Sequence, residues 1–92
     1  MSITSADIQK ALRIKRAVNE YFEKTTEIKV QAKELMNLFI EKGIFTHNHK
    51  DGLPIRDFLR TLEANHQLNL IPQAYFEQKD VNKNWFFIKT NK

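Results

Sequence analysis

The residues whose chemistry stands out lie in one segment, FTHNHKDGLPIRDFLR, at positions 45–60. His47, His49 and Asp51 alternate along it, and imidazole and carboxylate groups are ligands that Zn²⁺ and similar metals accept. A fourth ligand is missing from the segment, although folding could bring His66 near. Histidines and an Asp-Gly pair are equally ordinary in a turn that precedes a helix. We therefore expect a turn here, and no metal or other cofactor.

Two arginines follow the turn on the next expected helix. Arg56 and Arg60 stand four residues apart on its outer face, a like-charge spacing that costs an isolated helix about 0.2–0.5 kcal/mol. A phosphate group or a guanine edge would offset this repulsion, and the small Ala64 permits close approach. Asp57 and Glu63 lie close by and would repel phosphate. A solvated face on which Asp57 pairs with Arg60 is the alternative interpretation.

Net charge and composition point toward an anionic partner. The net charge is +4 and the pI is about 9.5, and basic domains attract polyanions. The excess is spread along the chain and forms no charged tail. The sequence contains no cysteine, which excludes disulfides and thiolate metal sites. It also contains no glycine-rich phosphate loop and no recognisable nucleophile with its base, so we expect no enzymatic activity.

Length and hydropathy predict a single domain that spans residues 1–92. No apolar run approaches the roughly 20 residues that cross a bilayer, so we expect no membrane partner. The N-terminal MSITSADIQKALRIKR lacks the apolar segment of a signal peptide. We therefore expect a cytoplasmic location.

The pattern of apolar residues predicts an α+β fold with a three-helix core, a short strand and a C-terminal β-hairpin. Helical spacing predicts three helices, at residues 5–24, 31–42 and 54–65. Alternation and β-branched residues predict three strands, at residues 25–30, 70–78 and 85–90. Gly43 suits a left-handed helix cap, and Pro54 suits a first helical turn. Pro72 restricts the start of its strand to an edge position.

The predicted hairpin is rich in aromatic residues. Alternation in WFFIK places Trp85 and Phe87 on one face of the strand and Phe86 on the other. A three-stranded sheet with helices on one side leaves its other face open, and exposed apolar area often marks an interface. We expect such an aromatic interface to include Tyr75, Trp85 and Phe87.

The order helix, strand, helix, helix, strand, strand resembles the winged-helix family over nearly the whole chain. In that family the third helix usually enters the DNA major groove, and the hairpin, or wing, contacts the DNA. The connection at residues 44–53 is longer than the three or four residues of a tight helix-turn-helix. The resemblance implies nucleic-acid contacts at Arg56, Arg60, Thr61, Lys79 and Lys83. Lys50, in the preceding loop, joins this set as a sixth candidate.

Two functions stay open at this point. The first is DNA binding of the transcriptional-regulator type, through residues 53–65 and a wing at 79–84, which predicts salt-sensitive binding to duplex DNA. The second is a protein-interaction or dimerisation module that uses the aromatic face of the hairpin. Folds of this type serve both purposes, so the resemblance does not decide between them.

Overall fold

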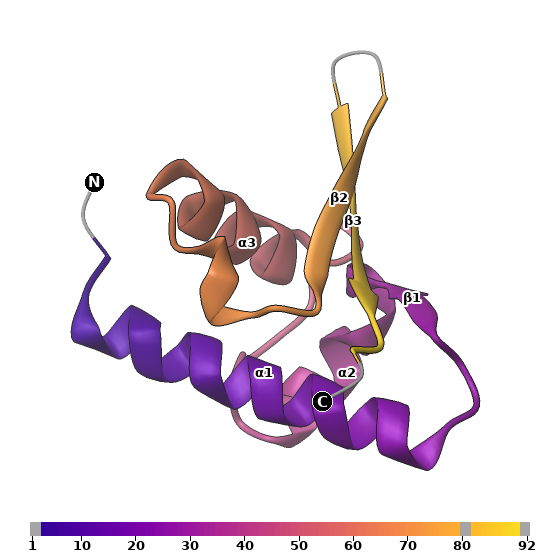
Figure 1. Ribbon diagram of the computed structural model, residues 1–92. Helices are drawn as coiled ribbons and strands as arrows, with labels where there is room; N and C mark the ends of the chain where they lie inside the picture. The colour runs from indigo at the N-terminus through magenta and orange to yellow at the C-terminus, as the bar shows by residue number, and fades with distance from the viewer. Residues whose placement is uncertain (1–2, 80–81, 91–92) are drawn as a thin grey trace.

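The longest helix, α1 (Ser5–Lys24), lies along one side of the domain in the computed structural model, which describes residues 3–79 and 82–90 (Figure 1). A capping box fixes its start, because the Thr4 hydroxyl accepts from the Asp7 backbone N–H while the Asp7 carboxylate accepts from the Thr4 N–H. One apolar stripe is buried, formed by Ala11, Ile14, Ala17, Val18 and Phe22. The predicted helix at residues 5–24 is confirmed.

The second predicted helix is shorter than its sequence pattern indicated. A 3₁₀ turn, η1 (Ala32–Leu35), precedes α2 (Met36–Glu41), so the prediction of one α-helix from residue 31 was wrong. Gln31 still pairs in a strand and provides no side-chain cap, and 3₁₀ geometry is common at such helix starts. The predicted cap at Gly43 is confirmed, with φ of +74° and a 2.8 Å bond from the Ile44 N–H to the Phe39 carbonyl.

The third helix, α3 (Leu53–Ala64), begins one residue before Pro54. Its spacing predicts an apolar stripe of Ile55, Phe58, Leu59 and Leu62, of which Ile55, Leu59 and Leu62 are fully buried and Phe58 is partly buried. The chain enters this helix through three successive residues with positive φ, namely Lys50, Asp51 and Gly52.

Three antiparallel strands form one sheet in the order β1-β3-β2. They are β1 (Lys29–Gln31), β2 (Ala74–Lys79) and β3 (Asn82–Ile88). The predicted C-terminal hairpin is confirmed, and in Figure 1 it projects away from α1. The predicted strand at 25–30 was wrong in its position, because pairing with β3 selects only residues 29–31. The strand predicted from residue 70 begins at Ala74, because a 3₁₀ turn, η2 (Leu68–Leu70), and the donor-free Pro72 precede it.

A single apolar cluster joins the helices to one face of the sheet. Phe39 of α2 meets Phe87 of β3 edge to face, with ring centroids 6.0 Å apart. Both rings are fully buried, so the central strand is fixed against the helical layer. The described residues therefore form three helices and a three-stranded antiparallel sheet, and the α+β prediction is confirmed. None of the described helices is both long enough and apolar enough to cross a membrane.

Candidate nucleic-acid interface

The outer face of α3 presents a small polar surface. Arg60 donates to the Asp57 carboxylate at 2.5 Å, and the Thr61 hydroxyl donates to the Asp57 backbone carbonyl at 3.0 Å. The side chains of Arg60 and Asp57 are 53% and 58% exposed, and Ala64 is exposed one turn further on. An ion pair this open contributes no more than about 1 kcal/mol, so Arg60 can exchange Asp57 for another partner.

Arg56 lies differently from Arg60, although both were predicted on the same face. Its Nη2 donates to the backbone carbonyl of Lys50 at 2.6 Å, which holds the loop against the first turn of α3. Its Nε is buried, and this nitrogen has no hydrogen-bond partner among the residues that the structure describes. Arg56 therefore holds the loop through Nη2, while its buried Nε donates no hydrogen bond to the described residues.

A groove of about 250 Å³ lies beside Arg56, between the loop, η1 and β3. Lys33, Arg56 and Lys83 line it, together with the carboxylate of Asp51. Lys33 donates to Asp51 at 2.9 Å, which leaves an excess of positive charge in the groove. Sequence reasoning missed Lys33, because it lies in an earlier element and only the tertiary fold brings it to Arg56.

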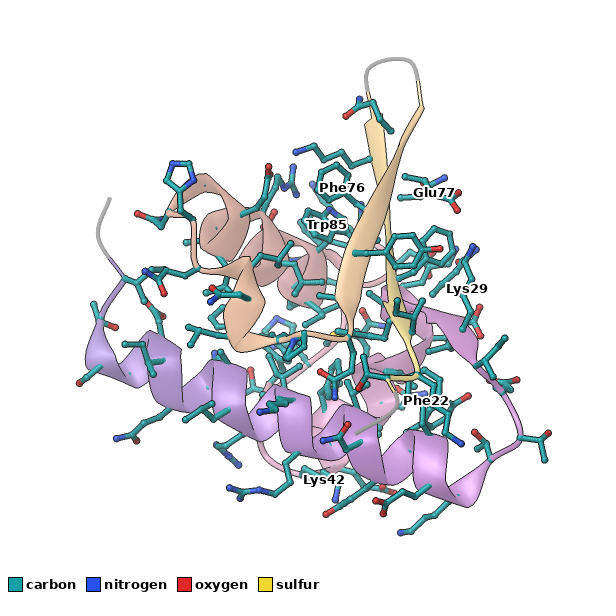
Figure 2. All side chains as sticks on the ribbon, in the orientation of Figure 1. Phe22, Lys29, Lys42, Phe76, Glu77 and Trp85 are labelled. Carbon is teal, nitrogen blue, oxygen red and sulfur yellow. The ribbon has the colours of Figure 1, made fainter. Side chains whose placement is uncertain are left out.

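Lys83 connects the hairpin to α3. Its Nζ lies 2.7 Å from the Glu63 carboxylate and 4.3 Å from the centroid of the Phe76 ring. Figure 2 shows Phe76 and Trp85 on the side of the hairpin that faces α3. Lys83 was predicted at the wing tip, and the structure instead places it between the wing and the helix. The backbone of Lys79 ends β2, whereas its side chain lies outside the described part of the chain.

The predicted nucleic-acid residues thus fall into neighbouring groups. Lys50 and Arg56 are joined through the loop carbonyl, and Arg60 and Thr61 share Asp57. Three acidic residues, Asp51, Asp57 and Glu63, pair with Lys33, Arg60 and Lys83 respectively. The surface is therefore a mixed one in which the cations outnumber the carboxylates.

The histidine segment shows turn geometry. The ring centroids of His47 and His49 lie 5.2 Å apart. The carboxylate of Asp51 forms a salt bridge with Lys33. His66 follows α3 at the end opposite to His49, about 18 Å along the helix axis. Within residues 3–79 and 82–90, no group of three or more His, Cys, Asp or Glu side chains is arranged to hold a metal ion.

The predicted aromatic interface needs a correction. Trp85 and Phe87 are 5% and 0% exposed, so the expectation that they form an open face was wrong. The helices cover the face that carries these two rings, and alternation alone does not tell which face will be covered. The open face instead carries Tyr75 and Phe86, a cross-strand pair stacked at 5.6 Å.

Two further residues complete this open face. Lys29 of β1 lies 4.4 Å from the centroid of the Phe86 ring and donates to Glu77 at 3.0 Å (Figure 2). Ile28, the residue before β1, is 71% exposed. We call this surface, formed by Lys29, Tyr75, Glu77 and Phe86, the outer sheet face; Ile28 stands two residues before the buried Val30 and does not belong to it.

Comparisons of the chain with protein-family models, with curated proteins and with solved structures found no match. The three helices and the antiparallel sheet with its C-terminal hairpin are compatible with a winged-helix-like arrangement. Function is therefore inferred from the surfaces described above.

Proposed function

We propose that this chain is a winged-helix-like domain that binds duplex DNA without catalysis, through α3 and the β2–β3 hairpin. The observation that carries the proposal is the groove at the start of α3, which Arg56 lines together with Lys33 of η1 and Lys83 of β3. A cationic groove beside an exposed helix face suits a phosphate backbone next to a DNA groove.

The phosphate contact is the first part of the proposed mechanism. Arg56 lines the groove, and its guanidinium would donate to a phosphate oxygen there in place of the Lys50 carbonyl. Lys33 supplies a second cation there, since its bond to the exposed Asp51 is weak in water. Charge-assisted bonds from arginine to phosphate are stronger than neutral ones, so the groove fixes the position of the domain on DNA.

The second part of the proposed mechanism is recognition of the bases by the exposed residues of α3. Arg60 would exchange Asp57 for the O6 and N7 acceptors of a guanine, a bidentate contact that the guanidinium geometry suits. Thr61 and the small Ala64 lie on the same exposed face, which allows the helix to approach base edges closely. Asp57 opposes this exchange through its own attraction to Arg60.

The test compares single-charge variants by fluorescence anisotropy with a duplex library at low salt. We expect Arg60→Gln to weaken binding about tenfold, because a base contact is lost. Asp57→Asn should strengthen binding, because it releases Arg60 and removes a negative charge. Arg16→Gln, which makes the same charge change on the exposed side of α1, is the matched control. Equal losses for Arg16→Gln and Arg60→Gln would remove α3 from the mechanism.

A second function is favoured by the outer sheet face. The stacked Tyr75–Phe86 pair forms an apolar surface, and Lys29 and Glu77 place one charge of each sign on it. Such a surface is self-complementary across a twofold axis, so we propose a homodimer as the alternative role. The DNA proposal does not require it.

Sedimentation velocity over a range of protein concentrations tests the alternative. A dimer should give a mass that rises with concentration, and Phe86→Asn should abolish the rise. Leu12→Asn is the control, because Leu12 is an exposed leucine of α1, 43% exposed, outside the outer sheet face. A strictly monomeric protein at the highest concentration would eliminate self-association.

A further inference from the structure

Asp57 lies on the outermost line of the α3 surface. The buried stripe of Ile55, Leu59 and Leu62 is on one side of the helix, and a rotation of about 100° per residue places Asp57 on the opposite side. Its side chain is 58% exposed, and that of Arg60, one turn further along, is 53% exposed. A DNA groove that receives this face of α3 therefore receives the Asp57 carboxylate together with the Arg60 guanidinium.

The Asp57 carboxylate needs a new hydrogen-bond donor when Arg60 leaves it for a guanine. In the free protein Arg60 is that donor, at 2.5 Å. The Thr61 hydroxyl does not replace Arg60, because it donates to the backbone carbonyl of Asp57. An ionised carboxylate that is removed from water and left unpaired weakens binding. The base pair that faces Asp57 therefore determines how well α3 fits the groove.

Major-groove chemistry limits which base provides the donor. Each base pair presents one amino donor there, N4 of cytosine or N6 of adenine. The adenine donor lies between two acceptors, its own N7 and thymine O4, whereas the cytosine donor lies at the edge of its pair with an acceptor on one side only. A carboxylate carries only acceptors, so cytosine suits it better than adenine.

The spacing of Asp57 and Arg60 places them at neighbouring base pairs. The two residues are three apart in the helix, which is about 4.5 Å along its axis. This distance is close to the rise of about 3.4 Å between successive nucleotides of a DNA strand. Two readers one turn apart on α3 therefore face two adjacent pairs.

We propose, on the basis of the DNA binding proposed above, that Asp57 is a specificity-determining residue that accepts a hydrogen bond from cytosine N4. Arg60 binds a guanine, and Asp57 selects cytosine in the adjacent pair, on either strand. The preferred duplex therefore contains two successive G·C pairs at the α3 contact. At an A·T pair the same carboxylate meets an acceptor on each side of the donor, so repulsion adds to the discrimination.

The experiment selects duplexes from a randomised library with the wild-type protein and with variants. Asp57→Asn should change the preference at one position from cytosine to adenine, because an asparagine amide pairs with adenine N6 and N7. Arg60→Gln identifies the guanine position, which should be adjacent. Asp51→Asn is the matched control, because it removes the same charge from the Lys33 pair in the groove, and its positive φ suits asparagine. It should raise affinity for all sequences alike and leave every base preference unchanged.

Fluorescence anisotropy on the selected duplexes measures the discrimination as a ratio of dissociation constants. The wild-type protein should prefer the G·C pair at the Asp57 position over an A·T pair by about fivefold or more, and Asp57→Asn should reverse this preference. An unchanged ratio in Asp57→Asn, with the guanine preference intact, would overturn the role of Asp57 and leave the DNA proposal standing. A change confined to the guanine position would also overturn it, since Asp57 would then only orient Arg60. Absence of duplex binding would overturn both proposals.

Discussion

Gly52 packs closely against η1 in the loop before α3. Its φ is +90°, and an added Cβ would lie 2.4 Å from the Cβ and 2.8 Å from the Cα of Lys33. Neither the backbone conformation nor the space accepts a side chain. The position of Lys33 in the groove beside Arg56 therefore depends on a glycine in the facing loop.

Replacing Gly52 tests this close contact. We expect Gly52→Ala to lower the free energy of unfolding by about 2–4 kcal/mol, because left-handed strain and overpacking add together. Gly43→Ala is the matched control, with φ of +74° but only Arg13 Nη2 at 3.7 Å from the added Cβ. It should lose about 1 kcal/mol. Urea denaturation measures both, and similar losses would show that crowding against Lys33 is relieved at little cost.

At the residue scale, the sequence predicted side chains whose role is local. The Gly43 cap follows from the spacing along α2, and the burial of Leu59 and Leu62 follows from the spacing along α3. The cluster of Lys33 with Arg56, and the buried amide of Gln73, do not follow, because each depends on elements far apart in the chain. The sequence predicted in part which side chains are charged and which are buried. It did not predict which side chains contact one another across the fold.

At the scale of elements, predictability followed length. The twenty-residue α1 and the twelve-residue α3 carry several turns of periodic signal, and both were found close to their predicted bounds. The three residues of β1 carry too little signal, since their position is set by pairing with β3. The sheet face that the helices cover was assigned wrongly for Trp85 and Phe87, because alternation is symmetric with respect to the two faces.

The connection between α1 and β1 contains a pH-sensitive contact. Near the end of α1, the Tyr21 hydroxyl donates to the Glu27 carboxylate at 2.5 Å, and this bond raises the pKa of Tyr21 from 10.0 to about 12. The raised pKa means that the folded state favours the protonated phenol. The stabilisation is therefore complete below about pH 10 and is lost as the pH rises through about 12.

Alkaline titration of the tyrosinate absorbance measures this contact. In a Tyr75→Phe background, which leaves Tyr21 as the remaining tyrosine, we expect a midpoint near 12. Adding Glu27→Gln should lower this midpoint toward 10.0, the ordinary value, because the carboxylate acceptor is removed. Circular dichroism at each pH identifies any unfolding. A midpoint that Glu27→Gln leaves unchanged would show that the bond does not form in solution.

At the scale of the whole molecule, the distribution of the net charge of +4 determines how strongly salt should affect the proposed DNA binding. Five cations belong to the proposed DNA surface, namely Lys33, Lys50, Arg56, Arg60 and Lys83. Each cation that neutralises a phosphate contributes about −0.9 to the slope of log K against log salt, so these five contribute about −4.5 at most. Lys79, whose side chain lies outside the described part of the chain, would add to this slope if it also contacts phosphate.

The salt slope gives a prediction for Lys33, the cation that the sequence did not reveal. Lys33→Gln should make the slope shallower by about 1 and weaken binding to all duplex sequences alike, because it removes a phosphate contact. Lys24→Gln, at the end of α1, should leave the slope unchanged. Anisotropy titrations at four salt concentrations measure both variants, and an unchanged slope for Lys33→Gln would exclude Lys33 from contact with phosphate.

The sheet order also has a consequence for folding during synthesis on the ribosome. The central strand, β3, is the last strand along the described chain, and both β1 and β2 pair with it. A nascent chain that has not yet extended past residue 88 therefore contains two strands with no partner between them. Such unpaired edges can pair with other chains, so we expect chains that end before β3 to aggregate more readily than the full domain.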